Sequence, residues 1–193
     1  MFKKNIQSSD IEKTLEALNR GGVILYPTDT VWGIGCDSTD EAAVERIFAI
    51  KRRGEARAML ALVDSFEMLA GYVDNIPANT VELIEKYTRP TTIIYPKAKN
   101  LASNIVADDG TVGIRIVKET FCRKLINMFG KPIVSTSANI SGKPAPAIFD
   151  EISEDIKAAV DYTVHWRQDD RRPATVSSII KLNADGSINV LRQ

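Results

Sequence analysis

The 193-residue sequence predicts an α/β fold in which a twisted, largely mixed sheet is flanked by helices. Two observations indicate this class: segments with helical periodicity alternate with short runs of β-branched residues, and the alternation continues along the whole chain. The length lies in the usual range of one domain and suffices for a core without disulfide or metal staples. No repeat, low-complexity segment or linker divides the chain, so residues 1–193 are expected to form a single domain.

The first half of the chain predicts three helices and two strands. Ser9 and Asp10 are candidate N-caps of a first helix, which Gly21 and Gly22 should end because glycine is common after a helix C-terminus. The run VILY that follows predicts a short buried strand ended by Pro27. The remaining elements are expected, in order, as a helix at 40–51, a strand at 59–63 and a helix at 65–72.

The second half predicts further alternation. Pro77 suits the first turn of a helix that reaches Tyr87. Asp185-Gly186 indicates a hairpin turn between the last two strands, and Gly130 should end a helix. The expected elements are strands at 91–95, 111–117, 132–137, 162–166, 176–182 and 187–192, and helices at 121–129 and 149–160.

Composition excludes several classes of protein. The 25 basic and 25 acidic side chains balance, which argues against a general nucleic-acid coat or a membrane-surface protein. The single histidine excludes a site with two histidine ligands, and two cysteines exclude a cysteine-rich zinc cluster, so no metal site of the chain's own is expected. No apolar run approaches the ~20 residues that span a bilayer, and the N-terminus lacks a signal-peptide pattern. We therefore expect a reduced, cytoplasmic protein.

Covalent catalysis finds little support in the sequence. A catalytic triad or a cysteine nucleophile would have to use His165, which we expect to be a packed or edge residue of a strand. Cys36 and Cys122 are expected to be small core residues. There is no P-loop, and Gly33-Ile34-Gly35 lacks the third glycine of a dinucleotide fingerprint.

Two polar segments in the first half of the chain are candidate functional loops. The segment YPTDTVWGIGCD (26–37) combines hydroxyls, a carboxylate and two glycines, which would let the backbone approach a ligand closely. The alternative is a tight strand-to-helix connection with Asp37, Ser38 or Asp40 as the next N-cap. The segment KRRGEAR (51–57) carries cations suited to a triphosphate or a carboxylate, the alternative being a solvated helix end.

Two further features lie later in the chain. In STSANISG (135–142) a strand delivers hydroxyls and an amide into one turn of small residues, which would form a neutral cradle for a phosphate or a ribose. Arg115 is a charge inside the apolar strand TVGIRIV, and a buried arginine requires an anionic partner, either a structural carboxylate or a bound one. Together with the first two segments, these features indicate an anion-binding cleft that acts by positioning and charge stabilisation.

These four features occur in the same order in the YrdC-like family, which the chain resembles from about residue 8 to Arg192. The resemblance implies one twisted α/β domain, related to the double-stranded-RNA-binding fold, with a large concave face, and it is closest to the short, single-domain form. Characterised members make L-threonylcarbamoyl-AMP and pyrophosphate from L-threonine, bicarbonate and ATP. Mg²⁺ is expected to accompany ATP, and separate tRNA-modification partner proteins are expected to transfer the threonylcarbamoyl group to adenosine 37 of tRNA.

The resemblance also implies roles for individual residues. Lys51 and Arg53 match the paired cations that face the substrate carboxylate and the phosphates, so both are candidate catalytic residues. Contacts to threonine are implied for Thr30, Arg115, Ser137 and Ser177. Contacts to the nucleotide are implied for Arg53, Arg57, Asn139 and Arg192.

The sequence departs from the family pattern at several positions near these motifs. The substituted positions are Ala58 for a proline, Leu62 for a histidine of some members, Arg89 for a glycine, Ala147 for a hydroxyl residue and Val176 for a proline. These changes concern individual contacts, especially those to the nucleotide. The alternative function is a non-catalytic paralogue of the same fold that binds RNA or the ribosome.

Overall fold

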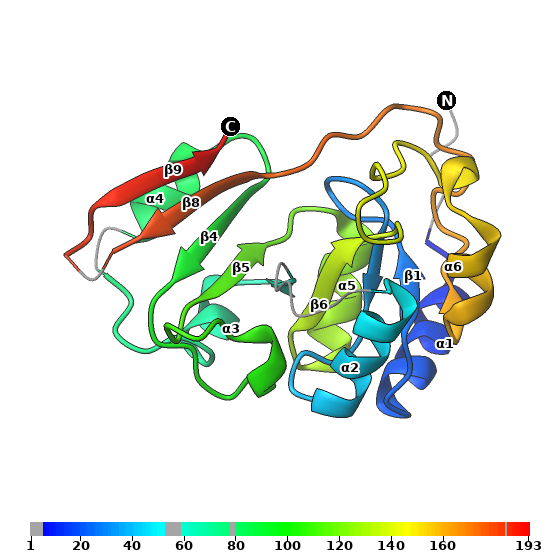
Figure 1. Ribbon diagram of the computed structural model, residues 1–193, viewed down its shortest axis with the longest axis horizontal. Coiled ribbons are helices and arrows are strands. Elements are labelled where there is room, and N and C mark those ends of the chain that lie inside the picture. The colour runs from blue at the N-terminus through cyan, green and yellow to red at the C-terminus, as the bar shows by residue number, and fades with distance from the viewer. Residues whose placement is uncertain (1–5, 53–58, 78–79, 184) are drawn as a thin grey trace.

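The computed structural model describes residues 6–52, 59–77, 80–183 and 185–193. Helices and strands alternate along this part of the chain, as the sequence predicts (Figure 1). In chain order the elements are α1 (Ser8–Asn19), β1 (Ile24–Tyr26), β2 (Gly33–Gly35), α2 (Glu41–Ile50), β3 (Leu60–Val63), α3 (Phe66–Ala70), α4 (Thr80–Lys86), β4 (Thr91–Tyr95), η1 (Ser103–Ile105), β5 (Val112–Ile116), α5 (Thr120–Phe129), β6 (Ile133–Ser137), η2 (Phe149–Glu151), α6 (Glu154–Ala159), β7 (Tyr162–Thr163), β8 (Ser178–Leu182) and β9 (Ile188–Arg192).

The strands form one mixed sheet in the order β7-β1-β2-β6-β3-β5-β4-β8-β9. Three neighbouring pairs are parallel, β1 with β7, β3 with β5 and β4 with β8, and the other neighbours are antiparallel. The sheet therefore has the mixed character that the sequence predicts. No helix in the described part of the chain is long and apolar enough to cross a membrane.

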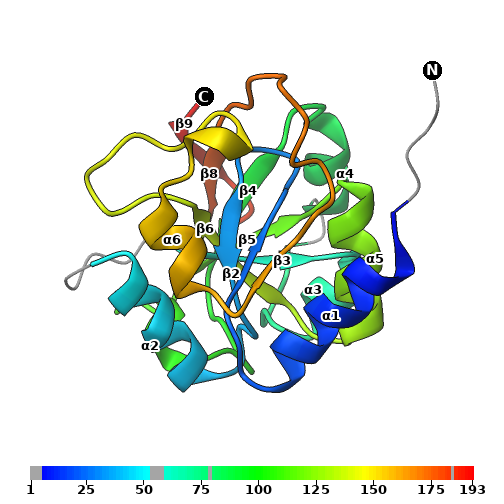
Figure 2. The same cartoon turned by 90° about the vertical axis from the view of Figure 1, so that its right-hand side faces the viewer.

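The half of the sheet around β1, β2 and β6 is covered on both faces. Helices α2 and α6 lie on one side and α1 and α5 on the other (Figure 2). Alternate residues of β1 divide between these two cores: Leu25 packs with Ile47 of α2, whereas Ile24 packs with Phe121 of α5. This alternation follows from the two-residue period of a strand.

Among the described helices, α3 and α4 pack against the half of the sheet around β5, β4 and β8, and both lie on one face. Val112 and Ile114 of β5 and Ile180 of β8 point into the core beneath these helices. Their neighbours along the strands, Arg115 and Ile179, point to the opposite face, where a cavity lies. Strand periodicity thus places a charged side chain over the open face of the sheet.

The structure confirms several local predictions. Asp40 caps α2 by accepting hydrogen bonds from the backbone of Ala42 and Ala43, and Gly130 ends α5 in the left-handed conformation. Gly186 adopts a positive φ in the turn that joins the antiparallel strands β8 and β9. Both cysteines are buried, and burial raises the pKa of the Cys36 and Cys122 thiols, so neither is an activated nucleophile.

The start of α1 differs from the prediction. The helix begins at Ser8 with Gln7 as its N-cap residue, which makes no side-chain cap hydrogen bond. Asp10 is buried inside the helix, where its carboxylate accepts hydrogen bonds from the backbone N–H groups of His165 and Trp166. It does not cap the helix because it anchors a distant segment. His165, which we expected in a strand, lies after the end of β7, and 69% of its side chain is exposed.

One strand was not predicted, and the bounds of two other elements were wrong. Gly33–Gly35 forms strand β2, which we expected to be part of a loop; its three residues pair with β1, and a Cβ at Gly35 would lie 2.3 Å from the Val134 carbonyl oxygen. Glycine therefore allows β6 to approach. The helix expected at 149–160 is divided into η2 and α6, and the strand expected at 162–166 is limited to β7.

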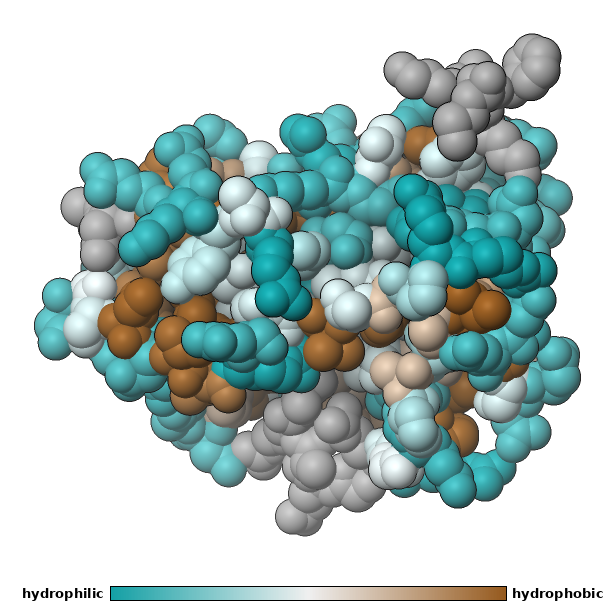
Figure 3. All heavy atoms as spheres, turned by 90° about the horizontal axis from the view of Figure 1, so that it is seen from above, coloured by the Kyte–Doolittle hydropathy of each residue, from teal (hydrophilic) through white to brown (hydrophobic). Residues whose placement is uncertain are grey.

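A long connection, residues 164–177, joins β7 at one edge of the sheet to β8 near the other edge. We call this connection the strap; it is drawn in orange along the top of Figure 1. On the face that it crosses, hydrophilic side chains surround paler residues of intermediate hydropathy (Figure 3). The strap thus connects the two differently covered halves of the sheet.

Candidate functional site

A cavity of about 620 Å³ lies over the open face of the sheet. Its size suits a small-molecule ligand. The described residues that line it include three cations, Lys51, Arg115 and Arg192, together with several hydroxyls and one amide, but no carboxylate. An anionic ligand therefore meets only attractive or neutral groups on these walls.

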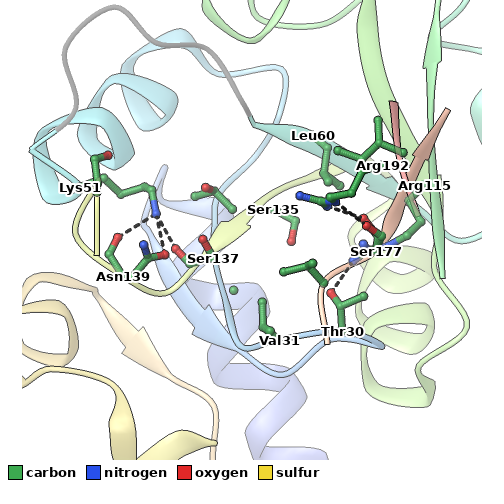
Figure 4. A pocket seen from close by; sticks show the side chains of 16 residues that line it. Thr30, Val31, Lys51, Leu60, Arg115, Ser135, Ser137, Asn139, Ser177 and Arg192 are labelled. Carbon is green, nitrogen blue, oxygen red and sulfur yellow. Dashed lines mark hydrogen bonds between the residues drawn. The ribbon is translucent and has the colours of Figure 1, made fainter. Parts of the chain in front are cut away.

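One end of the cavity, which we call the lysine end, consists of Lys51, Ser137 and Asn139 (Figure 4). The Lys51 ammonium donates hydrogen bonds to the backbone oxygens of Ser137, at 2.5 Å, and Asn139, at 2.8 Å. The Lys51 carbonyl accepts a hydrogen bond from the Ser141 N–H at 3.0 Å. These contacts fix the loop at 137–142, which we call the serine-rich loop, to the C-terminus of α2.

The amide of Asn139 contributes to the shape of the same loop. Its Nδ2 donates to the carbonyl oxygens of Ile140, at 3.1 Å, and Lys143, at 2.6 Å. The loop is therefore closed by its own asparagine on one side and by Lys51 on the other. A ligand at this end would meet preorganised polar groups rather than a flexible turn.

The opposite end, which we call the arginine end, consists of Thr30, Arg115, Ser177 and Arg192 (Figure 4). Arg115 is 3% exposed and forms an ion pair with the buried Asp29 carboxylate at 3.0 Å. Its Nη2 also donates to the Thr30 hydroxyl at 3.3 Å. Its Nε is buried without a hydrogen-bond partner among the described residues.

Ser177 belongs to a hydrogen-bonded group of three residues at this end. Its hydroxyl lies 3.0 Å from the Thr92 hydroxyl of β4, and its carbonyl oxygen accepts a hydrogen bond from Arg192 Nε at 2.9 Å. Thr92 was not among the predicted site residues. Its sequence context, TTIIY, shows only a strand-forming run, and the pairing of β4 with β8 is what brings it to Ser177.

The floor between the two ends is nearly neutral. It includes Gly33, Leu60, Ser135 and Thr136. A Cβ at Gly33 would lie 3.2 Å from the Ser135 hydroxyl, so glycine keeps this part of the floor low. The site therefore has cations at both ends and small polar groups between them.

The structure brings seven of the predicted site residues to this one cavity: Thr30, Lys51, Arg115, Ser137, Asn139, Ser177 and Arg192. Arg53 and Arg57, and the departure at Ala58, lie outside the described residues. Among the other departures, Leu62 is a core residue, Arg89 is exposed and Val176 lines the cavity. The role of Asp29 could not be predicted from the sequence, because its partner Arg115 lies 86 positions away along the chain.

The described residues contain no cluster of three or more His, Cys, Asp or Glu side chains that could hold a metal ion. Mg²⁺ prefers carboxylate, phosphate and water oxygens. Because the described walls of the cavity supply hydroxyls and cations, they fit a Mg²⁺ ion that is carried by the phosphates of a ligand rather than held by the protein.

Comparison with known proteins assigns the chain to a family. Residues 16–193 match the model of the family named for Sua5, YciO and YrdC, described as "Telomere recombination", and the chain belongs to that family. Over 159 residues, 81% of this chain and 85% of the relative, it is 33% identical to the threonylcarbamoyl-AMP synthase of Pseudoalteromonas translucida.

Solved structures agree in fold. The chain resembles P. abyssi Sua5 complexed with L-threonine with a TM-score of 0.82 and 29% identity, over 93% of this chain and 52% of that one. It thus spans about half the length of that protein. E. coli YciO, with a TM-score of 0.81 and 23% identity over 98% of this chain and 91% of its own, shares the short form of the fold.

Proposed function

We propose that the protein is an L-threonylcarbamoyladenylate synthase, a nucleotidyltransferase that joins L-threonine, bicarbonate and ATP. The observation that carries this proposal is the two-ended cavity, which has the buried Arg115 guanidinium at one end and the Lys51 ammonium at the other. An amino acid and a nucleotide are the two substrates that such a cavity would accommodate together. The similarity to threonylcarbamoyl-AMP synthases and to a threonine-bound Sua5 supports the same choice.

At the arginine end, the threonine carboxylate would accept hydrogen bonds from Arg115. A guanidinium suits this task because its planar donors match a carboxylate. The hydroxyls of Thr30 and Ser177 lie beside it and can hold the remaining polar groups of the amino acid. Burial of Arg115 strengthens the contact because little water competes.

At the lysine end, Asn139 would hold the nucleotide together with Lys51, while Arg192 would approach it from the arginine end. Ser137, which also lies at the lysine end, is the proposed contact to threonine there. Contacts of Arg53 and Arg57 with the phosphates remain predictions from the sequence. Mg²⁺ bound to ATP would neutralise part of the triphosphate charge. Holding the substrates together in one cavity would accelerate the reaction by proximity, which is the main source of catalysis in a site without an activated nucleophile.

The chemistry balances without a redox partner. The threonine amine attacks the bicarbonate carbon, a C–N bond forms and water leaves, giving N-carboxythreonine. An oxygen of that carboxylate then attacks the α-phosphorus, the bond to pyrophosphate breaks, and threonylcarbamoyl-AMP remains. The amine proton goes to bicarbonate or solvent, and no protein base is assigned. Separate partner proteins would pass the product on to tRNA, in the cytoplasm.

The test is pyrophosphate release by the purified protein with Mg-ATP. The proposal expects release that requires both L-threonine and bicarbonate, with omission of either as the control. Release that ignores both would indicate an unrelated nucleotide hydrolysis. No release, with salt-dependent binding of RNA by the folded protein, would instead indicate a non-catalytic paralogue.

A further inference from the structure

Arg167 is a partly buried cation of the strap that lies outside the lining of the candidate site. Its side chain is 28% exposed. Its backbone has φ +65°, in the left-handed region that non-glycine residues seldom adopt. A residue held in this conformation is usually fixed by specific contacts.

The guanidinium of Arg167 makes contacts on both of its sides. Its Nη1 donates a 2.9 Å hydrogen bond to the carbonyl oxygen of Thr28, and its Nε donates to Asp170 at 3.2 Å. The Glu119 carboxylate, which caps α5, lies 3.9 Å away. The carboxylates of Asp170 and Glu119 thus orient the Arg167 guanidinium. Its hydrogen bond to the Thr28 carbonyl holds the backbone of the segment that contains Thr30.

Thr28, whose carbonyl oxygen Arg167 contacts, is hydrogen-bonded to Thr30 of the arginine end. The Thr28 hydroxyl accepts a hydrogen bond from the Thr30 N–H and lies 3.0 Å from the Thr30 hydroxyl. The Thr30 hydroxyl in turn accepts from Arg115 Nη2. Arg167 therefore holds the backbone of Thr28, and hydrogen bonds from the Thr28 hydroxyl continue through Thr30 to the buried arginine.

We propose that Arg167 is a positioning residue that sets the turn at Thr28–Thr30, and through it Thr30 and Arg115, for the amino-acid substrate. The inference rests on the proposed synthase function. It assigns the effect to one end of the site, because the lysine end is held by Lys51 and the serine-rich loop, which Arg167 does not touch in the contacts above. Loss of Arg167 should weaken threonine binding selectively.

Two substitutions separate the effect of the guanidinium from that of the positive φ at position 167. Arg167→Gly preserves the positive φ, because glycine adopts it readily, and removes the bond to Thr28. Arg167→Lys keeps a cationic donor. Arg171→Ala is the matched control: it removes an arginine of the same strap whose ion pair with Asp150 is exposed on both sides.

Pyrophosphate release is measured against threonine and ATP separately, with threonine affinity measured by calorimetry and thermal stability recorded for each variant. In Arg167→Gly the KM for threonine should rise about tenfold, the order expected for one charge-assisted hydrogen bond, while kcat and the KM for ATP change less than twofold (roughly RT ln 2). Arg167→Lys should recover part of the loss, and Arg171→Ala should match the wild type.

Three results would overturn this role. Unchanged threonine affinity in Arg167→Gly would show that the turn keeps its position without the guanidinium. Equal increases in the KM for threonine and the KM for ATP, with a lowered melting temperature, would show a general structural role. A wild-type protein that releases no threonine-dependent pyrophosphate would refute the proposed function, and the inference that rests on it would fail as well.

Discussion

The buried pair of Arg115 and Asp29 predicts that removing the arginine alone will damage both stability and activity. Arg115 is 3% exposed and the Asp29 side chain 9% exposed. Arg115→Ala leaves a buried carboxylate without its counter-charge, which typically costs about 3–5 kcal/mol. For a chain of this size that corresponds to a fall of roughly 6–20 °C in melting temperature.

A second substitution separates the two effects. Asp29→Asn in the Arg115→Ala background removes the uncompensated charge, so at least half of the lost stability should return. Threonine recognition should not return, because the carboxylate-binding guanidinium is still missing. We expect the KM for threonine to stay about 100-fold above the wild-type value, equivalent to about 3 kcal/mol.

The assays are urea unfolding for stability and pyrophosphate release, titrated with threonine, for activity. Wild-type stability in Arg115→Ala would refute the claim that Asp29 depends on this arginine. A double variant with the wild-type KM for threonine would refute the assignment of Arg115 to the substrate carboxylate.

The remaining predictions concern strand β2, the lysine end and the strap. Gly35→Ala should cost about 1–3 kcal/mol, since the new Cβ meets the Val134 carbonyl oxygen; an unchanged melting temperature would contradict this. Lys51→Met should lower pyrophosphate release about 10–100-fold, because the serine-rich loop loses its charged anchor; wild-type turnover in this variant would contradict it. Hydrogen bonds from Arg172, above all, lower the pKa of Asp170. The stabilisation from this carboxylate is therefore present above its unfolded-state pKa of about 3.9 and is lost as the pH falls. Urea midpoints should decline less steeply between about pH 5 and pH 2 in Asp170→Asn, and parallel curves would contradict this.

Elements with a clear local signal could be predicted from the sequence. The cap at Asp40 and the turn at Gly186 depend on residues within a few positions: Asp40 was one of three candidate caps, and Gly186 lies in the expected turn. The strand β2 was missed because two of its three residues are glycines, which are depleted in strands, and its pairing with β1 and β6 is a tertiary effect. The capping role given to Asp10 was wrong for a similar reason, since its partners lie more than 150 positions away.

In the candidate site too, local signals could be predicted from the sequence and tertiary contacts could not. A charge inside an apolar strand predicts an anionic partner, which the sequence left open as a structural carboxylate or a bound one. The structure provides the carboxylate of Asp29 and also places Arg115 at the cavity. Its partner could not be identified, because Asp29 reaches it only when the turn after β1 is placed beside β5. Thr92 and Arg167 were missed on the same ground: each acts through a neighbour that only the sheet order or the strap brings near.

The most direct test of the central claim follows the carbon of bicarbonate. The purified protein is incubated with carbon-14 bicarbonate, L-threonine and Mg-ATP, and the nucleotide products are separated. The proposed function predicts label in an adenylate that also contains threonine, formed in step with pyrophosphate and absent when threonine is omitted. A folded protein that binds ATP but leaves every nucleotide unlabelled would contradict the claim.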